Sequence, residues 1–298
     1  MKQAVSNQYR KAMASLCSSM FIFGTIGIFV RYIPLPSSFI ALVRSVVGLL
    51  PLGAVVLAKG QGFSLSALKG KLGRLALSGI LMGFNWILLF EAYRYTTVAT
   101  ATLCYYLAPV FMILASPIVL KERLTAKKLV CVALALVGMV FVSGVLQAGF
   151  TGVSELTGIL LGTGAALLYA SVVLLNKTTG SVQPLDRTIV QMGAAAAVLL
   201  PYVLLTEQVS AMEFAPLTLV LLLVVGIIHT GIAYLLYFGS MGDLEAHTLA
   251  IFSYIDPIVA ILLSALLLSE PLGLGGIVGA VLILGAAFIS ELPEKKNN

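Results

Sequence analysis

The hydrophobic and polar positions of this chain form long blocks, in which apolar runs of about twenty residues are divided by short polar segments. Ten such runs lie near 11–31, 37–58, 74–93, 97–120, 127–146, 156–176, 184–206, 217–239, 247–268 and 272–291. A helix of roughly 20 residues crosses the ~30 Å hydrocarbon core and bonds its own backbone polar groups. Strands of a membrane β-barrel alternate over about ten residues, whereas these runs are continuous. The pattern predicts an all-α membrane protein with ten transmembrane helices.

Composition agrees with a membrane as the main solvent. The 298 residues are 60% hydrophobic and 10% charged, and the mean hydropathy is +1.07. Charged residues make up about 25% of soluble domains. The first run is too long for the apolar region of a signal peptide, and no small-residue cleavage site precedes the second run. We therefore expect the first helix to be retained.

Positive charge predicts the orientation, because Lys and Arg near span ends stay on the cytoplasmic side. With the N-terminus inside, only Arg31 and Arg94 of the 18 basic residues fall in outer segments, while Arg44 lies within a run. We expect a multi-pass protein of the plasma membrane with both termini in the cytoplasm. The net charge of +6 then reflects topology and anionic lipid headgroups. Nucleic acid is not an expected partner, because no basic patch interleaved with aromatic residues lies outside the runs.

The sequence resembles itself after a shift of 148 residues. The shift aligns without a gap Gly83 with Gly231, Phe90 with Phe238, Tyr106 with Tyr254, Pro109 with Pro257, Ser116 with Ser264 and Glu122 with Glu270. Each half, 1–148 and 149–298, holds five of the runs. Because five is odd, the second half would enter the membrane inverted. Transporters with inverted repeats bind substrate near the midplane between the repeats, and we expect the same here.

Two segments carry a family resemblance. LCYYLAPVFMILASPIVLKE at 103–122 and IFSYIDPIVAILLSALLLSE at 251–270 share a Tyr, a Pro three residues later and an apolar stretch ending in Leu-x-Glu. With NWILLFEAYRYTTVATAT at 85–102 and Arg44 in ALVRSVVGLLPL, they resemble the EamA type of the drug/metabolite transporter superfamily. The resemblance covers about residues 12 to 291. It implies two inverted five-helix repeats that move small metabolites, which in this family include amino acids, sugars, amines and drugs.

Three ionisable residues lie deep inside the runs: Arg44, His229 and Asp256. Each costs about 2.5–3.5 kcal/mol on insertion scales, so it needs a partner or a water-filled cavity. Pro257 has no N–H for the carbonyl of Ser253, which predicts a helix break beside Asp256. Asp256 is therefore a candidate proton site or a counter-charge for a cation. The alternatives are an N-cap of the helix restarting at Pro257 and a structural pair with Arg44.

His229 and Arg44 also have two interpretations each. His229 is either a satisfied core histidine or, facing the cavity, a proton relay beside Asp256, because imidazole changes charge near physiological pH. Arg44 either anchors a substrate carboxylate or pairs with Asp256. Glu91 and Arg94 are expected to form a local pair, three residues apart on one helix.

Aromatic and amide side chains on other helices either line the same cavity or serve in helix packing. Trp86 is the only tryptophan and lies too deep for an interfacial belt, and Asn85 beside it needs a partner. The predicted substrate-binding set is Arg44, Asn85, Trp86, Tyr105, Tyr106, His229, Tyr254 and Asp256, with Asp256 and His229 as the candidates for proton coupling. Glu122 and Glu270, at span ends, are expected to make helix-end hydrogen bonds that position gating helices.

Known motifs of catalysis and nucleotide binding are missing from the sequence. It has no phosphate loop, Walker motif, HExxH or GxSxG. Cys17, Cys104 and Cys131 lie in apolar runs without metal-binding spacing, so we interpret them as small core residues. We expect no cofactor, no metal and no enzymatic activity, and any pumping must use gradients.

The sequence thus predicts a secondary active transporter that moves small metabolites by alternating access. Amino acids and amines fit a cavity with one acid and one base, export is the expected direction, and protons are the candidate coupling ion. The lipid bilayer and a small-molecule substrate are the expected partners, with the chain acting as a monomer or a weak homodimer. The alternatives are a passive channel or facilitator and an intramembrane enzyme using His229 and Asp256.

Overall fold

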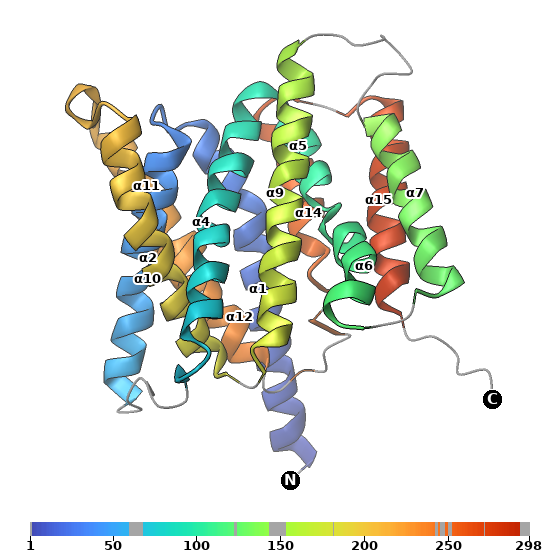
Figure 1. The fold of residues 1–298 in the computed structure, drawn as a ribbon, viewed down its shortest axis with the longest axis horizontal. Helices are drawn as coiled ribbons and strands as arrows, with labels where there is room; N and C mark the ends of the chain where they lie inside the picture. Colours follow the sequence, from blue (N-terminus) through green and yellow to red (C-terminus); the bar gives the residue numbers. More distant parts are fainter. Residues whose placement is uncertain are drawn as a thin grey trace.

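The computed structural model describes residues 2–59, 68–121, 124–142, 153–180, 182–241, 244, 248–249, 252–270 and 272–292. All regular secondary structure within these residues is helical, and most helices stand roughly alongside one another (Figure 1). The all-α part of the prediction is confirmed.

The two halves of the chain contribute similar series of helices. The first half provides α1 (Lys2–Arg31), α2 (Ser37–Lys59), α4 (Leu72–Tyr95), α5 (Val98–Tyr105), α6 (Ala108–Val119) and α7 (Ala126–Val142). The second half provides α9 (Val153–Thr178), α10 (Pro184–Thr206), the 3₁₀ turn η1 (Val209–Ala211), α11 (Pro216–Leu223), the π-helical segment η2 (Val224–Ile232), α12 (Ala233–Met241), α14 (Ile255–Leu267) and α15 (Leu274–Glu291).

Length and composition identify which of these helices can cross a membrane. In the described residues, seven helical stretches are long and apolar enough, with α5 and α6 counted as one stretch and α11, η2 and α12 as another. The helices Ile255–Leu267 and Leu274–Ser290 are apolar but shorter. Large apolar side chains such as Ile118, Leu205 and Leu274 are more than four-fifths exposed, which suits a surface in contact with lipid. The protein is therefore a multi-pass helical membrane protein.

Two helix interruptions lie next to prolines. α5 ends at Tyr105 and α6 begins at Ala108, one residue before Pro109. A turn precedes α14, which begins at Ile255, two residues before Pro257. Because proline lacks an N–H, the carbonyl four residues earlier loses its helical partner at each place. The break that the sequence predicts beside Pro257 is confirmed.

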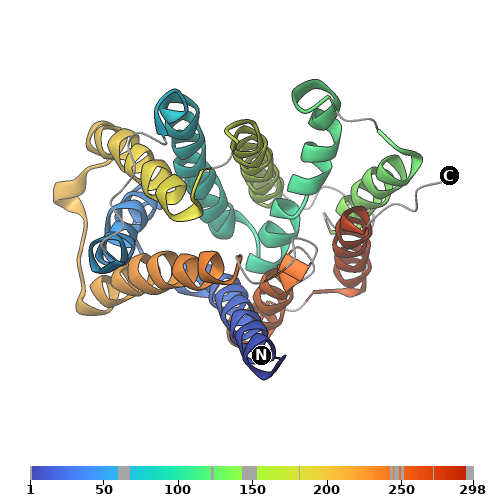
Figure 2. The same ribbon diagram turned by 90° about the horizontal axis from the view of Figure 1, so that it is seen from below.

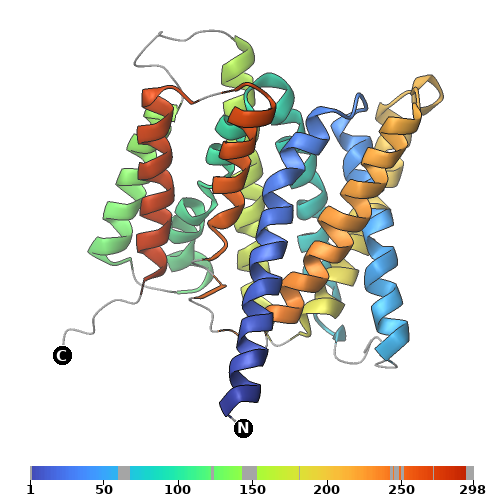
Figure 3. The same cartoon turned by 180° about the vertical axis from the view of Figure 1, so that it is seen from behind.

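Helices from the two halves interleave. α4 packs on both α9 and α10, and α1 packs on both α12 and α14. α2 contacts α10 and η2, while α9 also contacts α5 and α6. α7 and α15 pack on each other at one side of the molecule (Figure 2). α1 begins and α15 ends at the same end of the bundle (Figure 3).

Glycines permit the closest of these contacts. A Cβ added to Gly79 of α4 would lie 2.2 Å from the carbonyl oxygen of Gln191 in α10. One added to Gly24 of α1 would lie 2.5 Å from the carbonyl oxygen of Asp256 in α14. Small residues are common where membrane helices touch, because they let the two backbones approach. Gly24 thereby brings α1 against the start of α14, where the candidate site lies.

Candidate functional site

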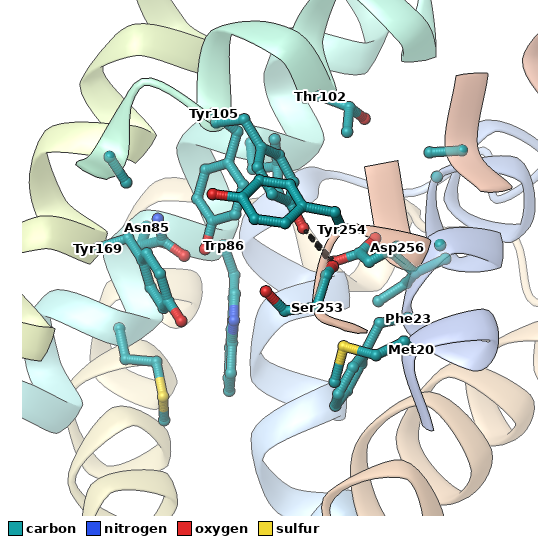
Figure 4. A pocket seen from close by; sticks show the side chains of 18 of the residues that line it. Met20, Phe23, Asn85, Trp86, Thr102, Tyr105, Tyr169, Ser253, Tyr254 and Asp256 are labelled. Carbon is teal, nitrogen blue, oxygen red and sulfur yellow. Dashed lines mark hydrogen bonds between the residues drawn. The ribbon is translucent and has the colours of Figure 1, made fainter. Parts of the chain in front are cut away.

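A cavity of about 290 Å³ lies among the helices beside the two interruptions. Many aromatic side chains contribute to its wall, namely Phe23, Trp86, Tyr93, Tyr105, Tyr106, Tyr169, Tyr234, Tyr237 and Tyr254. Figure 4 shows Ser253 and Asp256 on one side of it and Asn85, Trp86 and Tyr169 on the other. Helices from both halves of the chain thus build a single site.

Seven of the eight predicted binding residues line this cavity: Arg44, Asn85, Trp86, Tyr105, Tyr106, Tyr254 and Asp256. They come from α2, α4, α5, α14 and the turns at the two interruptions. His229 is not among the lining residues. The tertiary structure thus brings together side chains up to 212 positions apart, from Arg44 to Asp256.

Asp256 lies in the first turn of α14, where the helix dipole favours negative charge. The Tyr106 hydroxyl is 3.1 Å from Oδ2 of Asp256 and 3.3 Å from the carbonyl oxygen of Ser253, so it donates to this pair of acceptors. The carboxylate does not cap α14, since the N-cap residue is Tyr254 and no side-chain bond is made there. The N-cap alternative is therefore not the arrangement found, and the carboxylate faces the cavity.

Arg44 extends from α2 into the cavity wall and is 6% exposed. Its Nε donates to Oγ1 of Thr230 over 2.9 Å, and that hydroxyl in turn donates to the carbonyl of Val225. The guanidinium carbon lies 4.3 Å from the ring centroid of Trp86 and 5.7 Å from that of Phe90. Such cation–π contacts are most favourable with tryptophan. Neutral groups therefore hold the guanidinium in place.

The structural pair of Arg44 with Asp256 is also not the arrangement found. Within the part of the chain that the structure describes, ion pairs occur at helix ends, between Arg31 and Glu270 and between Arg94 and Glu91. The second of these confirms the predicted local pair. Arg44, which is buried, and Asp256, which is partly buried, thus lie in one cavity wall without a salt bridge between them.

Rings connect the two interruptions across the cavity. The centroid of Tyr106 lies 6.2 Å from that of Tyr254 and 6.3 Å from that of Tyr105. Tyr105 in turn lies 5.3 Å from Tyr169. Asn85 obtains its partner from another helix, because its Nδ2 donates to the carbonyl of Ala165 over 2.6 Å. The amide therefore fixes α4 to α9 beside the cavity.

His229 is placed in helix packing and not in the cavity wall. Its Nε2 lies 2.8 Å from Oγ1 of Thr25 in α1, and its Nδ1 lies 3.3 Å from the carbonyl of Val224. Because a carbonyl only accepts, Nδ1 carries a proton in this arrangement. The ring also packs on Phe29, with centroids 4.8 Å apart. The core-histidine interpretation fits this position, and the predicted place beside Asp256 is not found.

Glu270 ties three helices together at the end of the bundle where α1 ends. Its carboxylate pairs with Arg31 of α1 at 3.1 Å and accepts from the backbone N–H of Val98 at the start of α5, also over 3.1 Å. The hydroxyl of Ser264 in α14 donates to it over 2.8 Å. The predicted helix-end hydrogen bonding is confirmed for Glu270, while Glu122 lies outside the described residues.

Several lining residues were missed by the sequence reasoning, notably Phe23, Tyr169, Tyr234 and Tyr237. The repeat held a signal for two of them, because Tyr234 and Tyr237 are 148 positions after Trp86 and Leu89, and all four residues line the cavity. No comparable signal exists for Tyr169, whose counterpart position is Phe21, outside the wall.

The described residues contain no group of three or more His, Cys, Asp or Glu side chains that could hold a metal ion. Cys17, Cys104 and Cys131 are free thiols. Cys104 and Cys131 are buried, and Cys17 is partly buried.

The fold and the cavity define a class, a multi-pass helical membrane protein with a central aromatic site. The model of the EamA-like transporter family matches the chain twice, at residues 10–144 and 156–291. The chain belongs to this family. The resemblance to EamA-type members of the drug/metabolite transporter superfamily is thereby confirmed.

Known relatives agree with this assignment. The chain is 32% identical over 260 residues to the uncharacterized transporter YxxF of Bacillus subtilis (strain 168), covering 87% of this chain and 82% of the relative. It is 28% identical over 283 residues to an uncharacterized transporter of Archaeoglobus fulgidus, covering 94% and 96%. A protein of known crystal structure shares the fold with a TM-score of 0.65 at 22% identity, over 94% of this chain and 96% of the other. The protein is a membrane transporter for a small molecule.

Proposed function

We propose that the protein is a secondary active transporter that exports amino acids, amines or related small metabolites across the plasma membrane by alternating access. The observation that carries this proposal is the aromatic cavity with Arg44 and Asp256 in its wall, beside two helix interruptions. Ionisable groups within a membrane mark substrate and ion pathways. Interrupted helices in transporters are where substrates and coupling ions bind.

The proposed architecture is ten transmembrane helices in two inverted repeats, 1–148 and 149–298. The packing pairs support it, because a shift of 148 residues exchanges α1 with α9, α2 with α10 and α4 with η2 and α12. The contact of α1 with α12 then corresponds to that of α9 with α4, and the contact of α2 with η2 to that of α10 with α4. The contact of α1 with α14 corresponds to that of α9 with α6, because α14 and α6 are exchanged by the same shift. The double match of the family model points the same way.

Backbone geometry and ring contacts add to this support. In the described residues, the non-glycine positions with positive φ are Lys121 at 56° and Ser269 at 55°, which are 148 positions apart. Each would lie at the same left-handed turn of its repeat. Tyr106 and Tyr254 are repeat mates whose rings meet, as residues next to an approximate two-fold axis do.

The proposed orientation places both termini in the cytoplasm. The basic asymmetry of the sequence supports it, together with the position of the start of α1 and the end of α15 at one end of the bundle. The end tied by Glu270 would then face outward. We propose that Glu270 forms an outer gate. The cavity would open to the outside when the contacts of Glu270 with α1 and α5 break, and it would close when they form again.

Protons are the proposed coupling ion, with Asp256 as the primary site. Its carboxylate lines the cavity and receives the Tyr106 hydroxyl, so protonation would change both its charge and this hydrogen bond. His229 is the second candidate, because it joins η2 to α1 through Thr25. A change of charge there would alter contacts between two helices of opposite repeats.

Liposomes containing the purified protein test the proposal. A thermal-shift screen of amino acids and amines first selects a ligand, since stabilisation follows ligand concentration over affinity. We expect saturable uptake that unlabelled ligand on the opposite side accelerates, and accumulation when a pH gradient is imposed. Flux without saturation or acceleration would instead identify a channel. Arg94→Gln serves as a control, because Arg94 lies outside the cavity lining.

A further inference from the structure

Two opposite charges share the cavity wall without neutralising each other. Arg44 and Asp256 both line the cavity, and neither is within ion-pair distance of an oppositely charged side chain in the described residues. Arg44 is buried and Asp256 is partly buried, and a fully buried charge without a partner destabilises a protein by several kcal/mol. A bound molecule with complementary charges would satisfy both groups.

The Arg44 guanidinium offers one edge to a ligand. Of its five N–H groups, the one on Nε is bonded to Thr230. The Tyr234 hydroxyl is a second partner, and because the Nε hydrogen is already used it can occupy only one of the four N–H groups on the Nη atoms. The two Nη atoms therefore form the available edge, and such an edge matches the two oxygens of a carboxylate. Contacts with Thr230 and Trp86 hold this edge in a defined orientation.

Acceptor oxygens gather on the side of Asp256. Its Oδ2 and the Ser253 carbonyl oxygen both lie within 3.3 Å of the Tyr106 hydroxyl oxygen. Oδ1 of Asp256 receives no hydrogen bond from the described part of the chain. The Tyr106 hydroxyl contacts these oxygens and its ring lies 6.2 Å from that of Tyr254, and aromatic faces attract cations. This side of the cavity is therefore suited to a cationic group.

The cationic and the anionic sides face each other across a small space. Figure 4 shows Trp86, which contacts Arg44, on the side away from Asp256. The cavity volume of about 290 Å³ is at the lower end of the roughly 300–1,000 Å³ typical of ligand pockets. A small molecule would therefore reach both sides at once.

We propose that the transported molecule is a zwitterion, with its anionic group on the Nη edge of Arg44 and its ammonium group on Asp256. This inference rests on the proposed transport function and narrows its substrate class. A ligand that has an ammonium group but no anionic group leaves the charge of Arg44 without a partner. A ligand that has an anionic group but no ammonium group leaves the charge of Asp256 without a partner. A site whose buried polar groups stay unpaired rejects the analogue that lacks their partner.

Matched sets of ligands test the proposal on the purified protein. One set is L-phenylalanine, phenethylamine and 3-phenylpropionate, and the other is 4-aminobutyrate, butylamine and butyrate. Thermal shift and titration calorimetry would give the affinities. We expect at least one zwitterion to bind, and to bind at least tenfold more tightly than either single-charge relative.

Variants then assign each charge to its side of the cavity. Arg44→Gln should remove the preference for the zwitterion over its amine, and Asp256→Asn should remove the preference over its acid. Arg44→Lys keeps the charge but not the planar edge, so we expect an intermediate loss. Trp86→Ala, which frees the guanidinium, should weaken zwitterion binding about 2- to 30-fold on the usual scale of cation–π contacts. Arg94→Gln should leave all preferences unchanged.

Three results would overturn the proposal. They are binding of none of the zwitterions, equal binding of an amine or an acid to the wild-type protein, and unchanged preference in Arg44→Gln. Counterflow measurements in liposomes distinguish a failure of the zwitterion inference from a failure of the proposed transport function. If a singly charged metabolite shows saturable counterflow, the zwitterion inference fails and the transporter stands. If no metabolite does, the transport proposal itself fails.

Discussion

Replacing Glu270 with glutamine should loosen the end of the cavity where α1 ends. The carboxylate ties this end through Arg31 of α1, at 3.1 Å, and the backbone N–H of Val98 in α5, at 3.1 Å. Its third partner, Ser264, belongs to α14, which directly precedes Glu270, so that bond persists when the helices separate. Glutamine keeps the size and one acceptor oxygen but loses the charge that strengthens these bonds.

The size of the effect follows from the two bonds that join different helices. A hydrogen bond to a charged group contributes about 1.5–3 kcal/mol against about 1 kcal/mol for a neutral one, so the bond from Val98 weakens by about 1 kcal/mol. The Arg31 side chain is 35% exposed, and a partly exposed ion pair contributes up to about 1 kcal/mol. The total of about 1–2 kcal/mol shifts a two-state population by a factor of about 5–30.

Cysteine accessibility measures this shift. With the three native cysteines replaced, Met82→Cys places a thiol in the cavity wall. An impermeant thiol reagent applied to whole cells should modify it about 5–30 times faster in Glu270→Gln than in the wild-type background, following the population shift. Glu213→Gln, which removes an exposed carboxylate from the loop before α11, is the matched control and should have no effect. Equal rates for Glu270→Gln and the control would refute the gate.

Three further predictions address topology, coupling and packing. A cysteine at Gly149 should react with an impermeant reagent outside the cell and one at Lys295 should not, whereas the reverse would contradict the inverted repeats. Asp256→Asn keeps the shape of the side chain, so it should fold and exchange substrate in liposomes but lose accumulation driven by a pH gradient, and wild-type accumulation would argue against proton binding there. Gly24→Ala puts a methyl group 2.5 Å from the Asp256 carbonyl oxygen and should lower stability by about 1–3 kcal/mol in thermal unfolding. Gly285→Ala, with nothing within 4 Å of the added carbon, should be neutral or stabilising, and a similar loss in both variants would exclude the clash as the cause.

The sequence alone determined the helical class and the position of the helix break. Apolar runs of spanning length have no low-energy alternative to helix in lipid, because backbone groups there must bond within their own segment. Pro257 then breaks its helix for a local reason, the missing N–H, which needs no knowledge of neighbouring helices. Ionisable residues were informative for a similar reason, since Arg44 and Asp256 had to be placed away from lipid. Both line the cavity.

Only the tertiary structure decided which side chains meet. The sequence allowed His229 to face the cavity or to lie in the core, and the structure places it in the core, where it bonds Thr25, 204 positions away in the sequence. From the sequence, a pair of Arg44 with Asp256 was as plausible as their separation. In the structure, Arg44 contacts Thr230 and Trp86 instead. Asp256 accepts a hydrogen bond from Tyr106. Such partners belong to different helices, and their meeting depends on how each helix is rotated.

The physical reason is the weak contrast between the faces of a membrane helix. In a soluble protein an apolar stripe shows which face is buried, because the opposite face must be polar. Here the lipid is as apolar as the helix contacts, so both faces carry similar residues. Tyr169 and Tyr237 line the cavity while Leu205 faces outward, and nothing in the local pattern separates the two roles. Helix rotation is set instead by small residues such as Gly24 and Gly79, whose contacts lie on distant parts of the chain.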